Sequence, residues 1–253
     1  MNFGYTNDLV IFGVDSRRDD NLRSLPRKYL SILLVKRHKK PYENKWCIPG
    51  GFIEEKETSK EACIRVLKKE TGLENVYMQQ ISVNDDVKRD PRGRIISTTY
   101  MALVDRTLLK DELLDEVEWF DLYTTEEENI IKVSLTNGKE EINFSVLKEE
   151  VDKLTNNYEY KIQDRKLAFD HDKILVSSLM ELRNKVNDTD IVFHLMPTLF
   201  TMGELKQVYE LLLGKKLINS VFRRKLADKI EFTKEYIKTG GHRPSLLCRY
   251  KEK

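Results

Sequence analysis

The sequence has few of the features that mark exported, membrane-spanning or disulfide-bonded proteins. It begins without a basic stretch followed by a long apolar run, and no apolar run approaches the roughly 18 residues that a bilayer span requires. The three cysteines (Cys47, Cys63 and Cys248) are an odd number without CxxC spacing, and the four histidines are scattered singly. We therefore expect a cytoplasmic protein with no disulfide framework, no zinc site and no membrane partner.

The chain as a whole has little net charge, but each of its two parts has an excess of one sign. The 253 residues carry a net charge of only +2, and 40% of them are hydrophobic, enough for one large domain or two modest ones. Residues 198–253 contain 13 Lys or Arg and 6 Asp or Glu, a net of +7, which leaves 31 against 36, a net of −5, for residues 1–197. This asymmetry suggests a module that binds a polyanion, joined to one that does not.

The first part of the chain alternates strand-like segments with helices. The segments rich in β-branched and aromatic residues are 9–15, 28–38, 76–83, 97–105 and 116–123. A helix is predicted over 58–71, with Thr58 or Ser59 as N-cap and Gly72 just past its end, and helical spacing returns in 167–186. We expect a mixed α/β (α+β) domain over 1–190, with a hairpin insert at about 129–160 that turns at Asn137-Gly138.

One stretch of this domain carries a motif with fixed spacing. Its matching residues are Gly51, Glu57, Arg65, Leu67, Glu70, Gly72 and Leu73, and Trp46 and Pro49-Gly50 precede them. The pattern resembles the Nudix box: Gly, five residues, Glu, seven residues, Arg-Glu, and then two further glutamates before the last glycine. The resemblance implies a Nudix fold, in which helices sandwich a mixed sheet. Val66 and Lys69 depart from the motif, because they stand where the family has glutamates.

These departures bear on metal-dependent hydrolysis, the chemistry that the resemblance implies. Positions 66, 69 and 70 lie at i, i+3 and i+4, so their side chains share one helix face. Mg²⁺ requires oxygen ligands, but Val66 offers none and Lys69 brings a positive charge. We therefore assign no catalytic residue and expect no required cofactor. If hydrolase activity persists, Mg²⁺ would be held by Glu70 together with Glu57.

A second charged segment is a candidate for ligand binding. Arg89, Arg92 and Arg94 flank an Asp-Pro-Arg-Gly turn, and this segment resembles one in ADP-ribose pyrophosphatases and Nudix-type repressors. Arginine forks suit phosphate oxygens, so we expect the three arginines to contact a phosphorylated ligand. The alternative is a solvated turn with no ligand.

The basic C-terminal part, which we expect to be a separate domain over 191–253, shows a helix-turn-helix pattern. Thr201 and Glu204 have capping-box spacing and open a helix that ends at Gly214. A second helix is predicted from Val221 to about Ile230, with Asn219-Ser220 as N-cap candidates. Its apolar positions, Phe222, Leu226 and Ile230, leave Arg223, Arg224 and Lys225 exposed. Two strands around 239–244 would then form a wing with Arg243 at its tip.

The order of these elements resembles the Nudix-related transcriptional regulators. The residues that carry the resemblance are Leu-Ala-Phe-Asp-His at 167–171 and the segment from Met196 to Leu226. The resemblance implies a homodimer that binds double-stranded operator DNA through Arg223, Arg224, Lys225 and Arg243. It also implies a Nudix domain that senses ADP-ribose or another phosphorylated nucleotide or sugar. Two alternatives stay open: a Mg²⁺-dependent Nudix hydrolase of ADP-ribose or a nucleoside diphosphate sugar, and a module that binds only proteins.

Overall fold

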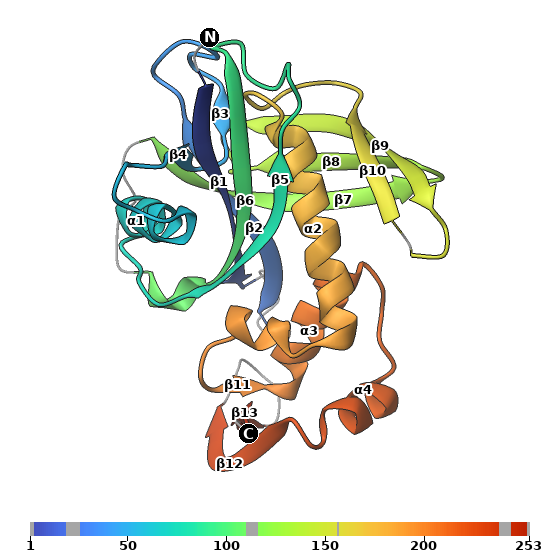
Figure 1. The fold of residues 1–253 in the computed structure, drawn as a ribbon. Helices are drawn as coiled ribbons and strands as arrows, with labels where there is room; N and C mark the ends of the chain where they lie inside the picture. Colours follow the sequence, from blue (N-terminus) through green and yellow to red (C-terminus); the bar gives the residue numbers. More distant parts are fainter. Residues whose placement is uncertain (1–2, 19–25, 110–115, 156, 238–243, 252–253) are drawn as a thin grey trace. The chain divides into compact units, whose positions relative to one another are not determined.

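The computed structural model describes residues 3–18, 26–109, 116–155, 157–237 and 244–251. The chain forms two compact units (Figure 1). The first comprises Met1–Phe12, Ser31–Leu103 and Leu109–Glu181, and the second comprises Gly13–Leu30, Val104–Leu108 and Leu182–Lys253. Among the described residues, no helix is both long enough and apolar enough to cross a membrane. The domain limits predicted from the sequence, 1–190 and 191–253, stay a prediction.

A ten-stranded sheet organises the N-terminal part of the chain. Eight strands follow the order β10-β9-β8-β7-β2-β1-β6-β5, while β3 pairs with β2 and β4 pairs with β1. The strands are β1 (Phe3–Arg17), β2 (Arg27–Lys36), β3 (Trp46–Cys47), β4 (Gly50–Phe52), β5 (Tyr77–Asn84), β6 (Arg94–Asp105), β7 (Val117–Glu127), β8 (Ile130–Thr136), β9 (Glu141–Asp152) and β10 (Asn157–Ile162). The five predicted strands correspond to β1, β2, β5, β6 and β7. A short 3₁₀ turn (Arg106–Leu108) follows β6.

The centre of this sheet is buried on both faces. In β1 every residue from Thr6 to Val14 is buried, and Leu9, Val10, Ile11 and Phe12 are fully so. A strand with one wet face would alternate buried and exposed residues, so β1 must be covered on both sides. The continuous apolar run in the sequence is therefore the signature of a central strand.

Helix α1 (Ser59–Thr71) has the ends that the sequence predicts. Thr58 is the N-cap, and its hydroxyl accepts from the Glu61 N–H while the Glu61 carboxylate accepts from the Thr58 N–H. Gly72 closes the helix with a φ of 71°, a left-handed conformation that glycine adopts without a Cβ penalty. The Nudix-box spacing thus maps onto a loop followed by this helix.

The predicted hairpin insert is a three-stranded extension of the sheet. Strands β8 and β9 are antiparallel with Thr136 opposite Glu141, so the loop is Asn137–Glu140. The Asn137 side-chain oxygen accepts from the Lys139 and Glu140 N–H groups, and Gly138 takes a φ of 84°. Strand β10 then pairs with β9 and forms the edge of the sheet.

Helix α2 (His171–Asp188) begins four residues later than the helical spacing suggests. Phe169 has a φ of 57°, which no α-helix accommodates. The Asp172 carboxylate accepts from the Lys166 and Leu167 N–H groups and so fixes 166–170 as a turn. The apolar spacing predicted the helix, whereas a side-chain hydrogen bond decides where it starts.

The C-terminal elements belong to the second unit. After a 3₁₀ turn (Ile191–Leu195) come α3 (Met202–Leu213) and α4 (Asn219–Leu226), and then a three-stranded sheet in the order β11-β13-β12. Its strands are β11 (Phe200–Thr201), β12 (Ile230–Ile237) and β13 (Ser245–Tyr250). The capping box at Thr201 and Glu204 is present, and Gly214 ends α3 with a φ of 64°. Two helices and a β-hairpin make the winged helix that the sequence predicts.

The second of these helices is shorter than predicted. Helix α4 ends at Leu226, and Ile230 starts β12 instead of extending the helix. The N-cap is Ile218, which makes no side-chain cap hydrogen bond, so the Asn219-Ser220 cap prediction is wrong. Phe222, Leu226 and Ile230 are nonetheless all buried, because the strand carries Ile230 into the same core.

Candidate functional site

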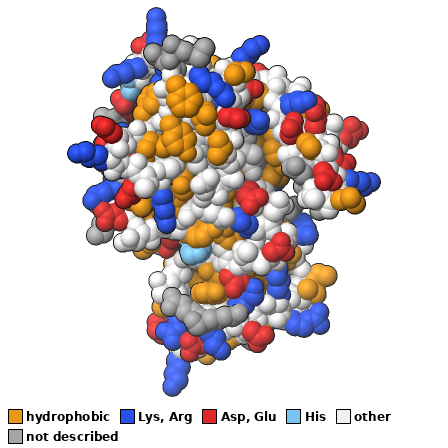
Figure 2. Space-filling view, in the orientation of Figure 1, with side chains coloured by type: hydrophobic (Ala, Val, Ile, Leu, Met, Phe, Trp, Pro, Cys, Tyr) orange, Lys and Arg blue, Asp and Glu red, His pale blue; other side chains and the backbone are white. Residues whose placement is uncertain are grey.

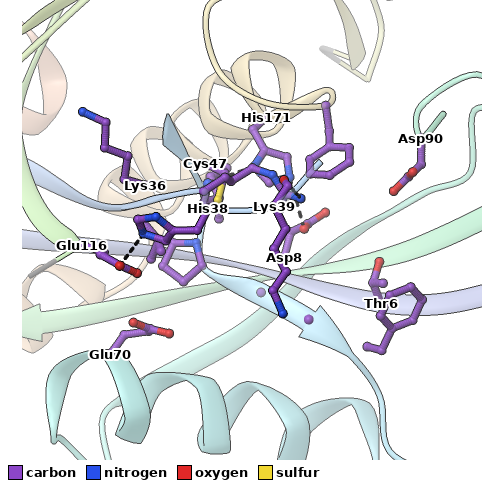
Figure 3. Close-up of a pocket in the computed structure, with 18 of the residues that line it drawn as sticks. Thr6, Asp8, Lys36, His38, Lys39, Cys47, Glu70, Asp90, Glu116 and His171 are labelled. Atoms are coloured by element: carbon purple, nitrogen blue, oxygen red, sulfur yellow. Dashed lines mark hydrogen bonds and ion pairs between the residues drawn. The ribbon is translucent and has the colours of Figure 1, made fainter. Parts of the chain in front are cut away.

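A cleft of about 340 Å³ opens in the first unit. It is lined from β1, the end of β2 and the loop after it, the β3–β4 segment, the end of α1, residues 89–92 and the start of α2 (Figure 3). Its lining contains six Lys or Arg and four Asp or Glu residues. The excess of positive charge favours an anionic ligand.

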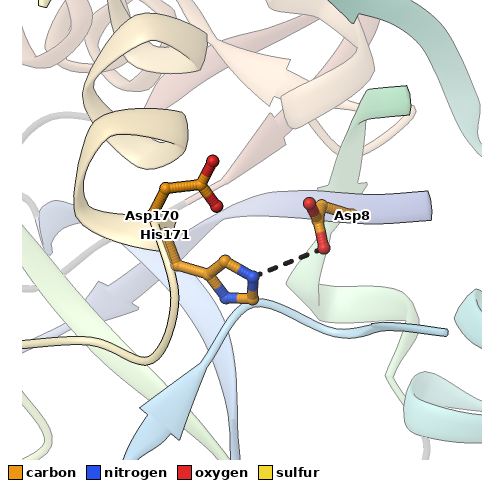
Figure 4. A group of neighbouring side chains, drawn as sticks. All are labelled: Asp8, Asp170 and His171. Atoms are coloured by element: carbon orange, nitrogen blue, oxygen red, sulfur yellow. Dashed lines mark ion pairs between the residues drawn. The ribbon is translucent and has the colours of Figure 1, made fainter. Parts of the chain in front are cut away.

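A buried charge cluster adjoins the cleft: Asp8, Arg89 and His171 belong to the lining, and Figure 4 shows Asp8 and His171 with their neighbour Asp170. Arg89 donates to Asp170 through Nε (3.0 Å) and one terminal nitrogen (2.8 Å), and that nitrogen also reaches Asp8 Oδ2 (2.8 Å). His171 accepts the Ile48 N–H at Nδ1 (2.9 Å), so its proton lies on Nε2, 3.4 Å from Asp8 Oδ1. Burial raises the pKa of Asp8, but His171 and Arg89 outweigh it and lower the pKa to about 2.

The spacing of this cluster, but not its bonding, would suit a metal ion. Ligand atoms of Asp8, Asp170 and His171 lie within 4.8 Å of one another, a spacing that could hold a metal ion. However, the Arg89 guanidinium already binds both carboxylates, and Nδ1 of the histidine is engaged with backbone. A dication would have to displace a buried, permanently charged arginine. The donor set therefore fits an internal ion-pair network and does not fit a metal.

In the first half of the Nudix-box motif, Glu57 and Arg65 stabilise the loop before α1. Arg65 donates from Nε to Glu57 (2.9 Å) and from a terminal nitrogen to the Phe52 carbonyl (3.2 Å). The hydrogen bonds from Arg65 lower the pKa of Glu57 to about 2. Glu57 does not line the cleft, and Gly51 does. The pair ties the loop before α1 to β4, which leaves Glu57 little freedom to bind a metal.

The second half of the motif does not make a magnesium site. Val66 is buried and contributes no oxygen, while Lys69 places its ammonium 2.6 Å from Glu70 Oε1. On this helix face, Glu70 Oε2 is a buried oxygen that has no hydrogen-bond partner among the described residues. Mg²⁺ needs several converging oxygens in octahedral geometry, so the residues present do not fit the ion.

The three arginines predicted to bind ligand lie in different surroundings. Arg89 lines the cleft but is buried and holds Asp8 and Asp170. Arg92 lines the cleft, pairs with Asp90 (2.6 Å) and lies over the rings of Phe52 and Phe169 at 5.3 and 5.2 Å. Arg94 does not line the cleft, and its side chain donates to the Asp85 carbonyl. The structure therefore brings two of the three together.

Several cleft residues escape sequence reasoning. Asp8 is far from Asp170 and His171 in the chain and belongs to no motif, and the Leu-Ala-Phe-Asp-His segment gives no sign that its last two residues meet Asp8. Phe169 appears in the Leu-Ala-Phe-Asp-His segment, but its place between the guanidinium groups of Arg37 (4.7 Å) and Arg92 depends on its left-handed backbone. The one sign in the sequence that could have indicated these residues is the pair Asp170-His171 at the start of a predicted helix.

The C-terminal unit presents a basic helix. Arg223, Arg224 and Lys225 are exposed on α4, opposite the buried Phe222 and Leu226. Lys225 is partly engaged, because its ammonium lies 5.8 Å from the Tyr209 ring centroid and 3.4 Å from the Asn187 carbonyl oxygen. The exposed side chains of Arg223 and Arg224 make no hydrogen bond or ion pair within the described part of the chain. Their forks are available to phosphate or to base edges.

The rest of this surface is less uniform. Figure 2 shows acidic side chains among the basic ones over the C-terminal elements on the face drawn there. Arg243, predicted as a DNA contact on the wing, lies outside the described residues. On the face drawn in Figure 2, the +7 net charge of this part of the sequence therefore does not make a continuous positive surface.

Both parts of the chain match the models of known protein domains. Residues 22–136 match the model of the NUDIX domain, and residues 192–250 match that of the NrtR DNA-binding winged helix domain. The ADPR responsive transcriptional repressor NtrR of Acinetobacter baylyi is 30% identical over 251 residues, which cover 97% of this chain and 81% of that protein. The chain belongs to the family of NrtR-type Nudix-related transcriptional regulators. The family resemblance inferred from the sequence is confirmed.

Solved structures agree with the family assignment. NrtR of Shewanella oneidensis, crystallised with a 27mer DNA, matches with a TM-score of 0.68 and 25% identity over 98% of this chain and 93% of its own. A MutT/nudix family protein from Enterococcus faecalis matches with a TM-score of 0.71 over 99% and 87%, and at 23% identity it shows the fold alone. The predicted fold, a mixed α+β Nudix domain followed by a winged helix, is confirmed.

Proposed function

We propose that this chain is a DNA-binding transcriptional regulator whose cleft binds ADP-ribose or a related phosphorylated ligand. The observation that carries the DNA part is the exposure of Arg223 and Arg224 on the second helix of a winged helix of NrtR type. Lys and Arg that replace condensed counterions supply much of the affinity for a duplex. The relative from Acinetobacter baylyi is an ADPR responsive repressor, so repression released or strengthened by ligand is the expected mode.

The ligand part rests on the charge of the cleft and on the loss of its metal site. The lining has more Lys and Arg than Asp and Glu, which suits a phosphorylated molecule. Val66 and Lys69 remove the oxygens that hydrolysis of such a molecule would need. A cleft that binds without cleaving is suited to sensing.

We also propose that the protein acts as a homodimer on a palindromic operator. A helix-turn-helix protein reads one half-site per copy, and two-fold symmetry of the protein then matches two-fold symmetry of the DNA. Analytical ultracentrifugation of the free chain and of its DNA complex would measure the stoichiometry. A monomer on a single half-site would contradict this part.

The DNA proposal is tested with the upstream region of the gene itself, by fluorescence anisotropy at several salt concentrations. The double variant Arg223→Ala and Arg224→Ala should bind at least about tenfold more weakly, and its salt slope should fall by up to about 2 if both arginines contact phosphates. Lys60→Ala is the matched control, because Lys60 is an exposed cation on α1. Unchanged affinity and slope in the double variant would show that α4 is not the recognition helix.

The alternative function is hydrolysis. An ADP-ribose pyrophosphatase of Methanocaldococcus jannaschii is 38% identical over 92 residues, which cover 36% of this chain and 54% of that protein. Glu57 and Glu70 also keep their motif positions. Incubation with ADP-ribose and Mg²⁺ or Mn²⁺, followed by measurement of AMP, separates the two functions. Rapid release of AMP that is lost in Glu70→Gln would support the hydrolase.

A further inference from the structure

Glu70 differs from the other acidic residues of the cleft in having one buried oxygen without a partner among the described residues. The residue is 6% exposed, and its Oε1 lies 2.6 Å from the Lys69 ammonium. Its Oε2 is buried and has no hydrogen-bond partner among the described residues. Figure 3 shows the side chain projecting from α1 among the residues that line the cleft. A buried acceptor is unfavourable without a donor, so this oxygen calls for one from the ligand.

The backbone that carries Glu70 is held by the end of the helix. Glu70 lies in the last turn of α1, where the Thr71 hydroxyl donates to the Leu67 carbonyl (2.8 Å) and the Gly72 N–H donates to the Lys68 carbonyl (2.9 Å). The ion pair with Lys69 engages Oε1 and leaves Oε2 as the oxygen without a partner among the described residues. Such a preorganised acceptor can discriminate between ligands, because little side-chain entropy is lost on binding.

The acidic residues that line the cleft cannot combine to hold a dication. Asp8 is bound by Arg89, Asp90 by Arg92, Glu116 by His38 and Glu70 by Lys69. Each carboxylate of the lining thus has a basic partner in the described part of the chain, and Glu57 is held by Arg65 outside the lining. A metal ion would have to break several of these pairs to gather the oxygens that it needs.

A neutral donor suits Glu70 better than a cation. Lys69 already compensates its charge, and the cleft as a whole is basic, with Arg37 and Lys39 bearing no carboxylate partner among the described residues. An anionic ligand that also offers neutral donors is a sugar phosphate or a nucleotide, whose hydroxyl groups donate well to carboxylates. We infer that Glu70 Oε2 accepts a hydrogen bond from a hydroxyl of the phosphorylated ligand, and that the former metal-binding position thereby selects for sugars. This inference rests on the proposed function.

Isothermal titration calorimetry of the full chain with three probes tests the inference. ADP-ribose and ribose 5-phosphate carry hydroxyl groups, whereas inorganic pyrophosphate carries the charge without a sugar. In Glu70→Gln the amide oxygen should turn to Lys69, so that the NH₂ group replaces the acceptor in the cleft. ADP-ribose and ribose 5-phosphate should then bind roughly ten- to a hundredfold more weakly. Pyrophosphate should bind as tightly as before or more tightly, because a negative charge has been removed.

The control variant is Glu74→Gln, the same substitution at an exposed glutamate that pairs with Lys68 outside the cleft. It should leave all three affinities at wild-type values, and thermal unfolding checks that Glu70→Gln is folded. Equal affinity of wild type and Glu70→Gln for the sugar-bearing probes would overturn the inference and leave the proposed function intact. Failure of the wild type to bind any probe would contradict both.

A measurement of metal binding tests the alternative explanation, that Glu70 is a metal ligand. Binding of Mn²⁺ to the wild type, followed by electron paramagnetic resonance, should be weak and should not depend on Glu70. Affinity for ADP-ribose should be the same in EDTA and in Mg²⁺. Mn²⁺ binding that is lost in Glu70→Gln, together with ligand binding that requires Mg²⁺, would show that Glu70 is a metal ligand and would overturn the inference.

Discussion

Arg89 shows how burial decides what a charged side chain can bind. The sequence predicts it as a phosphate ligand, and it does reach the cleft lining. Its guanidinium nevertheless donates to Asp170 through two nitrogens and to Asp8, and the residue is 5% exposed. Breaking a buried ion pair leaves an uncompensated charge in the protein interior, so it costs more free energy than breaking an ion pair at the surface. Its role as a ligand contact stays a prediction, while its role in joining β1 to the turn before α2 follows from its hydrogen bonds.

This cluster should make stability depend on pH through Asp8. The pKa of Asp8 is about 2 in the folded protein against an ordinary value of 3.8, so the charged form favours folding. The contribution is complete above the unfolded value and is lost as the pH falls through about 2. We expect Asp8→Asn to remove about 2 kcal/mol of this pH-dependent stability, measured as free energy of unfolding in urea between pH 5 and pH 2.

The matched control is Asp85→Asn, which changes an exposed carboxylate in the loop before Arg89. Its stability curve should follow that of the wild type over the same range. A curve for Asp8→Asn that falls as steeply as that of the wild type would mean that other groups govern acid unfolding.

At the scale of elements, the glycine that begins the Nudix box and the glycine just before it have different roles. Strand β4 pairs with β1, with Gly50 opposite Asp8 and Gly51 opposite Asn7. A Cβ on Gly50 would lie 2.2 Å from the Asn7 carbonyl oxygen, whereas a Cβ on Gly51 meets nothing within 4 Å. The contact at Gly50 is with backbone, so it cannot be relieved by a side-chain rotation.

Alanine substitutions should therefore separate these neighbours. Gly50→Ala should destabilise the protein by about 1–3 kcal/mol or more, because β4 must move away from β1. Gly51→Ala is the control and should change the free energy of unfolding by less than about 0.5 kcal/mol. Chemical denaturation of both variants measures the difference. Equal stability of the two would show that β4 can shift without cost.

Elements with local signals could be predicted, and those set by distant contacts could not. The N-cap at Thr58, the capping box at Thr201 and the glycines that end α1 and α3 follow from residues within one turn, and the structure confirms them. The end of α4 does not, because Ile230 continues the apolar spacing but enters β12 to reach the same core. Periodicity predicts which residues are buried, not which element carries them.

The candidate site follows the same division. The departures from the metal-binding motif are visible in the sequence, since Val66 and Lys69 stand at fixed motif positions. The Asp8, Arg89 and Asp170 cluster could not, because its members are 81 residues apart or more and only the folded sheet brings them together. The free oxygen of Glu70 likewise depends on where the Lys69 ammonium lies.

At the scale of the whole molecule, opposite charges on the two parts of the sequence correspond to two kinds of ligand. Residues 198–253 carry +7 and include the basic helix, while residues 1–197 carry −5 and include the cleft. Net negative charge disfavours contact with DNA outside the basic module. A regulator with this distribution should bind DNA with a strong dependence on salt and its small ligand with a weaker one.

If ligand and DNA control each other, their coupling must be reciprocal. An effector that changes the affinity for operator by some factor has its own affinity changed by operator by the same factor. We expect ADP-ribose to shift the operator affinity of the full chain by about 5- to 150-fold, the usual range of allosteric coupling. Anisotropy titrations with and without saturating ADP-ribose give one factor, and calorimetry of ADP-ribose with and without operator gives the other. The two factors should agree within error, and they should also agree in Glu70→Gln, although the affinity for the ligand falls.

Operator affinity that does not change at saturating ADP-ribose would contradict this prediction. The cleft would then not control the winged helix, and a different effector would regulate DNA binding.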